Sequence, residues 1–182
     1  MANPARLKDV ADIAAQYARQ TPLILVLSAP QGVTNALLAL VSAAQHGAEW
    51  QSALDRLHTQ FSHLVEQAVP GLSDHQQKQL QLATTQQLQA LADYAKGIAL
   101  LRHCPDPVQA RMLGTGEQFS VALMTALLKA RGLNAGSLDS TRVVRSQGDY
   151  LNAGADLPAT RAAFAAAKAQ GMPRIAVMAG FI

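Results

Sequence analysis

An apolar run that leads directly into a short polar loop constrains the fold of this sequence more than any other feature. Five consecutive apolar residues, Leu23–Leu27, are too few for a helix of ordinary length and are typical of a strand that is buried on both faces. Pro30 and Gly32 then interrupt regular structure, and an amphipathic helical pattern begins near Asn35. The segment from 23 to 46 therefore predicts a strand, a loop and a helix.

Two hydroxyl residues, Ser28 and Thr34, border this loop. We expect Thr34 to cap the helix that begins near Asn35, because its hydroxyl can accept a hydrogen bond from a backbone N–H that has no partner inside the helix. Helix N-termini favour anions, and ligands of open α/β sheets bind at the carboxyl ends of strands. Residue chemistry alone leaves two interpretations open: a candidate anion site, or an ordinary strand-to-helix connection with a capped end.

Helical periodicity dominates the first hundred residues. Apolar side chains recur every three or four residues in several segments, each of which is predicted to form an amphipathic helix. The first helix has Asn3 as its cap and Pro4 at its first position, and Ser73 with Gln76 forms a capping box at the start of the last. The predicted helices span about 3–20, 35–46, 50–68 and 73–98. The last two form a predicted helical hairpin, an insertion over about residues 49–100.

A long helical pattern that begins at Asp106 and ends at Gly132 contains two glycines, Gly114 and Gly116, separated by one residue. Each glycine inside a helix costs about 1 kcal/mol relative to alanine, so the pair indicates either a close approach of another backbone or a break between two helices. If the helix breaks, Glu117 lies in the first turn of the second helix. A carboxylate at that position either complements the helix dipole or belongs to a site.

The last third of the chain alternates between short strand and helix patterns. Strands are predicted at 133–139 and 174–178, with a possible edge strand at Val143–Val144, a turn at Gly148–Asp149 and a helix from Pro158 to about Gln170. Alternating strands and helices imply a parallel sheet with right-handed crossovers. Organisation alone therefore predicts one half of a doubly wound α/β domain.

Composition argues against several classes of function. The formal net charge is +3 and no cluster of Lys and Arg with interleaved aromatic residues is present, so no nucleic acid partner is expected. The single cysteine, Cys104, cannot form an internal disulfide and is interpreted as a small packed hydrophobe in a reducing cytosol. We expect neither a signal sequence nor a membrane span, and hence a cytoplasmic protein with no membrane partner. The five histidines show no metal-ligand spacing, which predicts no metal site.

Several short motifs give the sequence a resemblance to a known family. They occur in one order along nearly the whole chain. The motifs are Val-Leu-Ser-Ala-Pro at 26–30, Val-Thr-Asn at 33–35, Gly-Ile-Ala-Leu-Leu at 97–101, Cys-Pro-Asp at 104–106, Gly-Glu-Gln-Phe-Ser at 116–120, Ala-Arg-Gly at 130–132 and Met-Ala-Gly-Phe-Ile at 178–182. Any one of them is weak alone. Together they make the sequence resemble aspartokinases, most closely the kinase part of bifunctional aspartokinase/homoserine dehydrogenases.

The resemblance implies the amino-acid kinase fold, a partial α/β/α sandwich here, and ATP-dependent phosphorylation of the side-chain carboxylate of L-aspartate. By position, Ser28 and Thr34 match the loop hydroxyls at the substrate and the transferring phosphate. Glu117 matches the glutamate that holds the substrate's amino group, and Phe181 matches the aromatic residue that lines the aspartate pocket. These roles suit the chemistry, because an ammonium group needs a fixed carboxylate and developing phosphoryl charge needs hydroxyl and backbone donors. The resemblance also implies ATP and Mg²⁺ as cofactors of the full-length family, and lysine and threonine biosynthesis as its context.

The sequence departs from the family pattern at both ends. The 182 residues contain neither the Lys-Phe-Gly-Gly-Thr-Ser strand, whose lysine contacts the transferring phosphate in the family, nor the Arg-Gly-Ser-Asp type of substrate loop. We therefore expect residues 1–182 to form a single incomplete aspartate-binding lobe that has no catalytic residue of its own, binds no ATP or Mg²⁺ and is inactive alone. The alternative is a non-catalytic binding or assembly module, which pairs with a partner chain or with a second copy through a bare sheet edge.

Overall fold

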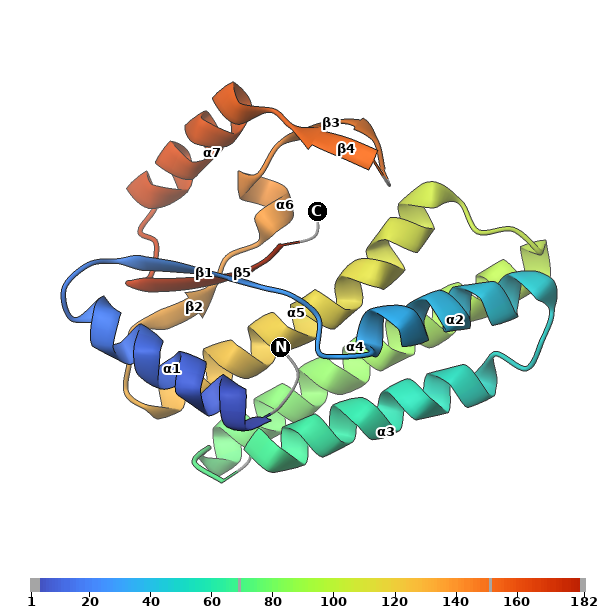
Figure 1. The fold of residues 1–182 in the computed structure, drawn as a ribbon, viewed down its shortest axis with the longest axis horizontal. Coiled ribbons are helices and arrows are strands. Elements are labelled where there is room, and N and C mark those ends of the chain that lie inside the picture. Colours follow the sequence, from blue (N-terminus) through green and yellow to red (C-terminus); the bar gives the residue numbers. More distant parts are fainter. Residues whose placement is uncertain (1–3, 69, 151, 181–182) are drawn as a thin grey trace.

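The computed structural model describes residues 4–68, 70–150 and 152–180 (Figure 1). In chain order the elements are α1 (Pro4–Ala18), β1 (Leu23–Leu27), α2 (Val33–His46), α3 (Gln51–Ala68), α4 (Asp74–Leu101), α5 (Asp106–Ala130), β2 (Ala135–Ser137), α6 (Ser140–Val143), β3 (Ser146–Asp149), β4 (Asn152–Ala155), α7 (Leu157–Ala169) and β5 (Ile175–Ala179). Helices α1 and α5 lie on one face of a small sheet, and α6 and α7 lie beyond its other face (Figure 1). The arrangement is layered, as an α/β protein requires.

The sheet is parallel and has the strand order β1-β5-β2, which confirms the predicted α/β class. β1 pairs with β5 from Leu23↔Ile175 to Leu27↔Ala179, and β2 pairs with the other side of β5, beginning at Ala135↔Ile175. Every residue of β5 is buried, which explains why this central strand is apolar without alternation. The carboxyl ends of the three strands therefore lie at the same edge of the sheet.

β1 differs from its prediction, because only one of its faces is covered. Leu27 is buried and Leu25 packs against the core, whereas Ile24 is 47% exposed and Val26 is 60% exposed. β1 is an edge strand of the described sheet, while β5 lies in the middle. A short apolar run predicts a strand but does not distinguish these two positions.

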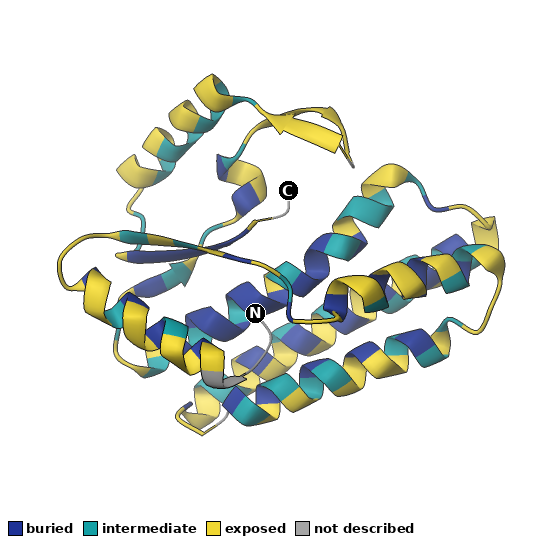
Figure 2. Ribbon diagram, in the orientation of Figure 1, coloured by how far each residue is buried: buried dark blue, intermediate teal, exposed yellow. Residues whose placement is uncertain are grey.

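Helices α2, α3, α4 and α5 pack together and bury most of the core, with their buried residues on the sides that face one another (Figure 2). α3 and α4 form the predicted helical hairpin. The predicted capping box starts α4: the N–H of Gln76 donates to Ser73 Oγ at 3.4 Å, and the N–H of Ser73 donates to Gln76 Oε1 at 2.9 Å. Within the described ranges, no helix combines the length and apolar character needed to cross a lipid bilayer.

The segment between β2 and α7 folds differently from its prediction. Val143 ends the short helix α6, which Asp139 caps by accepting from the N–H of Thr141 at 3.0 Å, so the predicted edge strand at Val143–Val144 is wrong. Gly148–Asp149 lies in β3 and pairs with β4 in an antiparallel hairpin. All residues of β3 and β4 are exposed, so this hairpin lacks the alternating apolar pattern from which strands are predicted.

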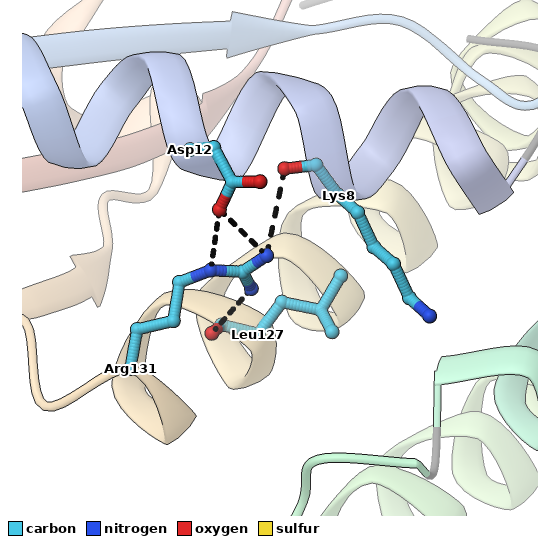
Figure 3. A network of polar contacts seen from close by, with 4 residues as sticks. All are labelled: Lys8, Asp12, Leu127 and Arg131. Atoms are coloured by element: carbon cyan, nitrogen blue, oxygen red, sulfur yellow. Dashed lines mark hydrogen bonds and ion pairs between the residues drawn. The ribbon is translucent and has the colours of Figure 1, made fainter.

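A polar network joins α1 to the end of α5 (Figure 3). Arg131 Nε donates to Asp12 Oδ1 at 3.0 Å, and Arg131 Nη2 lies 3.0 Å from the same oxygen. The Arg131 guanidinium also donates to the carbonyl oxygens of Leu127 and Lys8, at 3.2 and 3.5 Å. Because the Asp12 side chain is mostly exposed, the ion pair contributes at most about 1 kcal/mol to stability. Its main effect is to fix the position of α1 beside α5.

Candidate functional site

Three parts of the chain meet at the carboxyl edge of the sheet: the loop after β1, the end of β5 and the middle of α5. The N–H of Gly180, directly after β5, donates to the carbonyl oxygen of Leu27 at 3.2 Å. On α5, Ser120 Oγ donates to the carbonyl oxygen of Ser28 at 2.9 Å. These hydrogen bonds hold the start of the predicted binding loop against both β5 and α5.

α5 is one continuous helix, which rules out a break as the explanation of its two glycines. The other explanation, a close approach, holds at Gly116. A Cβ atom on Gly116 would stand 2.7 Å from Val33 Cγ1 and 2.9 Å from Ala29 Cβ, which is closer than side chains approach one another. The loop after β1 and the start of α2 therefore pack directly on the backbone of α5.

Glu117 is half-buried in the middle of α5. Because it lies several turns from the N-terminus of that helix, the helix dipole does not explain its presence. Glu117 Oε2 lies 3.8 Å from the position that a Cβ on Gly180 would occupy, so the carboxylate stands at the end of β5. Ser120, about one turn further along α5, contacts Ser28. The same stretch of α5 thus carries Glu117 and supports the loop after β1.

The structure describes the two hydroxyl residues of the predicted site, but its aromatic residue lies outside the described part of the chain. Ser28 and Thr34 are both exposed. Thr34 is not the cap of α2: the helix begins at Val33, Gly32 occupies the N-cap position with a φ of 80°, and no side chain among the described residues caps it. This left-handed backbone favours glycine, so loop geometry sets the start of the helix. Phe181 lies outside the described residues, and the convergence of all four residues stays a prediction.

A cleft beside α5 was not predicted from the sequence. It has a volume of about 740 Å³ and lies between α4, α5 and the segment that runs from α6 to β4. Its polar lining includes Gln87, Arg111, Gln118, Asp139 and Arg145. Because these residues come from separate elements, no spacing in the sequence could have shown that they share one cleft.

Cys104 packs as a small buried side chain, as predicted, and is 5% exposed. Burial, together with the nearby Asp106 carboxylate, raises the pKa of the Cys104 thiol. A raised pKa keeps the thiol protonated, which suits a packing role and not a nucleophile. In the part of the chain that the structure describes, no group of three or more His, Cys, Asp and Glu side chains could hold a metal ion.

Comparisons with known proteins agree on one family. The model of the amino acid kinase family matches residues 1–182. The bifunctional aspartokinase/homoserine dehydrogenase of Buchnera aphidicola subsp. Acyrthosiphon pisum is 24% identical over 187 residues, and that of Haemophilus influenzae is 28% identical over 192 residues. Each match covers 100% of this chain but only 22% of the relative, so the chain spans about a fifth of the length of these proteins.

Solved aspartokinases share the fold described above. E. coli aspartokinase III in complex with aspartate and ADP matches with a TM-score of 0.79, and its complex with lysine and aspartate matches with a TM-score of 0.81, both at 23% identity. Each match covers 97% of this chain and 37% of the solved chain. The aspartate kinase of Clostridium acetobutylicum matches with a TM-score of 0.67 at 14% identity, covering 97% of this chain and 36% of that one. The chain therefore belongs to the amino acid kinase family and is homologous to the aspartokinase part of the bifunctional enzymes.

Proposed function

We propose that residues 1–182 form the aspartate-binding lobe of an aspartokinase, an enzyme that phosphorylates the side-chain carboxylate of L-aspartate with ATP. The homologous bifunctional enzymes and the solved structures with bound aspartate support this proposal. The observation that carries it is the position of the Glu117 carboxylate at the end of β5, on the stretch of α5 that also holds the loop after β1. Ligands of parallel α/β sheets bind at this edge.

In this proposal, Glu117 pairs with the ammonium group of aspartate. A half-buried carboxylate on a long, packed helix is held in place, and hydrogen bonds between charged groups are stronger than those between neutral ones. The carboxylate that receives the phosphate is then bound by the Ser28 and Thr34 hydroxyls and by the N-terminus of α2, because these groups favour negative charge. Phe181 supplies the apolar wall of the pocket.

Phosphoryl transfer depends on positioning and on stabilising the charge of the transferred group, which ATP-dependent enzymes achieve with Mg²⁺ and basic side chains. E. coli aspartokinase III binds ADP together with aspartate. The motifs matched in this sequence include no nucleotide-binding segment, so we assign ATP and Mg²⁺ to no residue of this chain. The isolated 182 residues are proposed to bind aspartate without phosphorylating it.

The Glu117→Gln substitution is expected to weaken L-aspartate binding by about tenfold to a hundredfold, because the ammonium group loses its charged partner. Isothermal titration calorimetry of the 182-residue chain measures this loss, and adding ATP with Mg²⁺ to the same sample should produce no ADP. Glu66→Gln removes an exposed carboxylate from α3 and is the matched control, which should keep the wild-type affinity. Undiminished binding by the Glu117→Gln protein would exclude Glu117 from the site. A wild-type chain that does not bind aspartate would contradict the proposal as a whole.

The uncovered face of β1 favours a second candidate function, that of an assembly module. Ile24 and Val26 are exposed on an edge strand of the described sheet, and such a strand presents backbone N–H and C=O groups that can pair with another strand. Contiguous exposed apolar surface often marks a protein interface. For this case we propose self-association of two copies along β1.

Self-association along β1 predicts an oligomer that dissociates on dilution. Light scattering over a dilution series is expected to show a dimer at high protein concentration, and Val26→Lys should shift the equilibrium to monomer because it places a charge on the edge strand. Leu100→Lys is the control, since Leu100 is 78% exposed but lies on α4. A monomer at every concentration of the wild-type chain would rule out this second function.

A further inference from the structure

We propose that the cleft beside α5 binds a small anionic metabolite, which Arg111 and Arg145 hold from two different elements of the fold. The cleft volume of about 740 Å³ lies within the range of small-molecule sites, about 300–1,000 Å³. Ser28, Thr34 and Glu117 are not among the residues that line it. The inference rests on the charges of the cleft and not on the proposed aspartate site, although Gly114 and Gln118, which flank Glu117 on α5, belong to the lining.

The charges of the lining favour an anion. Arg111 lies on α5 and Arg145 directly precedes β3, and in the described part of the chain neither guanidinium forms an ion pair. Among the described lining residues, the carboxylate of Asp139 is the negative group, and its Oδ1 already accepts from the N–H and the hydroxyl of Thr141 at 3.0 and 2.7 Å. A guanidinium group binds carboxylate or phosphate through paired hydrogen bonds. The cleft therefore offers two such groups to one ligand.

The lining also contains uncharged polar and aromatic side chains. Gln87 lines the cleft from α4. Its Oε1 is shielded from solvent and therefore from the cleft, so we assign this oxygen no ligand contact. Tyr94 and Tyr150 add aromatic side chains to the lining. The ligand class is a phosphorylated or carboxylated metabolite.

Calorimetric titration of the 182-residue chain with glycerol 3-phosphate and with L-malate, at constant ionic strength, tests this proposal. Glycerol 3-phosphate carries a phosphate and hydroxyl groups and L-malate carries carboxylates and a hydroxyl group, so the stronger binder identifies the preferred anion. Arg111→Gln and Arg145→Gln are each expected to weaken binding of that probe by about tenfold or more.

Arg142→Gln is the matched control, because Arg142 is exposed on α6, close to Arg145 in sequence, and does not line the cleft. It should keep the wild-type affinity. A wild-type chain that binds neither probe at millimolar concentration would overturn the proposal. Unchanged affinity in both Arg111→Gln and Arg145→Gln would overturn it as well. An equal loss of affinity in the Arg142→Gln and Arg145→Gln proteins would also overturn the proposal, because equal losses indicate nonspecific charge attraction.

Discussion

The Phe119→Ala protein is expected to lose about 3–5 kcal/mol of its free energy of unfolding, which is the usual cost of truncating a buried aromatic side chain. The rings of Phe61 on α3 and Phe119 on α5 stack with their centroids 4.1 Å apart and their planes 7° apart, and both side chains are completely buried. The pair thus joins the α3–α4 hairpin to the helix that carries Glu117. Urea unfolding, followed by circular dichroism, measures the loss.

The control for this prediction is Phe164→Ala, which makes the same chemical change on α7. Phe164 is only half-buried, and α7 has no buried residue. Truncating Phe164 should therefore lower the free energy of unfolding clearly less than truncating Phe119. In the double variant with Phe61→Ala, the two losses should differ from additivity by about 0.5–1.5 kcal/mol, the coupling energy of a ring pair. Equal losses at positions 119 and 164 would show that the stacked pair does not anchor the core.

The same substitution at two helical glycines is expected to have opposite effects. Gly116→Ala forces a Cβ to within 2.7 Å of Val33 Cγ1 and 2.9 Å of Ala29 Cβ, so we expect a net loss of about 1–2 kcal/mol, rising to about 3 kcal/mol for Gly116→Val. Gly97→Ala on α4 adds a Cβ that, apart from its chain neighbours and the nearby backbone of α4, meets no described atom within 4 Å. It should stabilise the protein by about 0.5–1 kcal/mol, because alanine favours the helix over glycine.

Thermal and denaturant unfolding of the three glycine variants checks this prediction. The close contact at Gly116 also bears on the site, because Ala29 belongs to the loop after β1. In the Gly116→Val protein we therefore expect weaker aspartate binding even at temperatures where the chain stays folded. A stabilised Gly116→Ala protein would mean that α2 moves away from α5 without cost, which is contrary to the packing described here.

The pattern of apolar residues in the sequence predicted the helices and strands that pack one face against the core. Local signals that the structure confirms are the apolar run at 23–27, the stripes of α3 and α4, the capping box at Ser73 and the strand predicted at 174–178, observed at Ile175–Ala179. The hairpin of β3 and β4 carries no such signal, because all its residues are exposed. The burial of β1 could not be predicted either, since it depends on where the strand stands in the sheet.

Only those features of the candidate site that leave a signal within a short stretch of the sequence could be predicted. The glycine at position 116 indicated a close approach, but the residues that approach it, Ala29 and Val33, are distant in sequence. Thr34 has the chemistry of a helix cap, yet Gly32 starts the helix because its left-handed backbone turns the chain first. Arg111 and Arg145 carry no sequence signal for a shared cleft, since only the three-dimensional arrangement brings α5 and β3 together.

The central position of β5 has a consequence for how the sheet forms during synthesis. β1 and β2 each pair with β5 and not with one another, and β1 is made well over a hundred residues before it. Helices α2 to α5 contact one another and all precede β5 in the chain, so they can assemble while translation continues. The two outer strands must wait for their shared partner to emerge from the ribosome. Until then the nascent chain exposes the apolar side chains and the unpaired backbone groups of β1, which makes this interval the one in which a chaperone has most to protect.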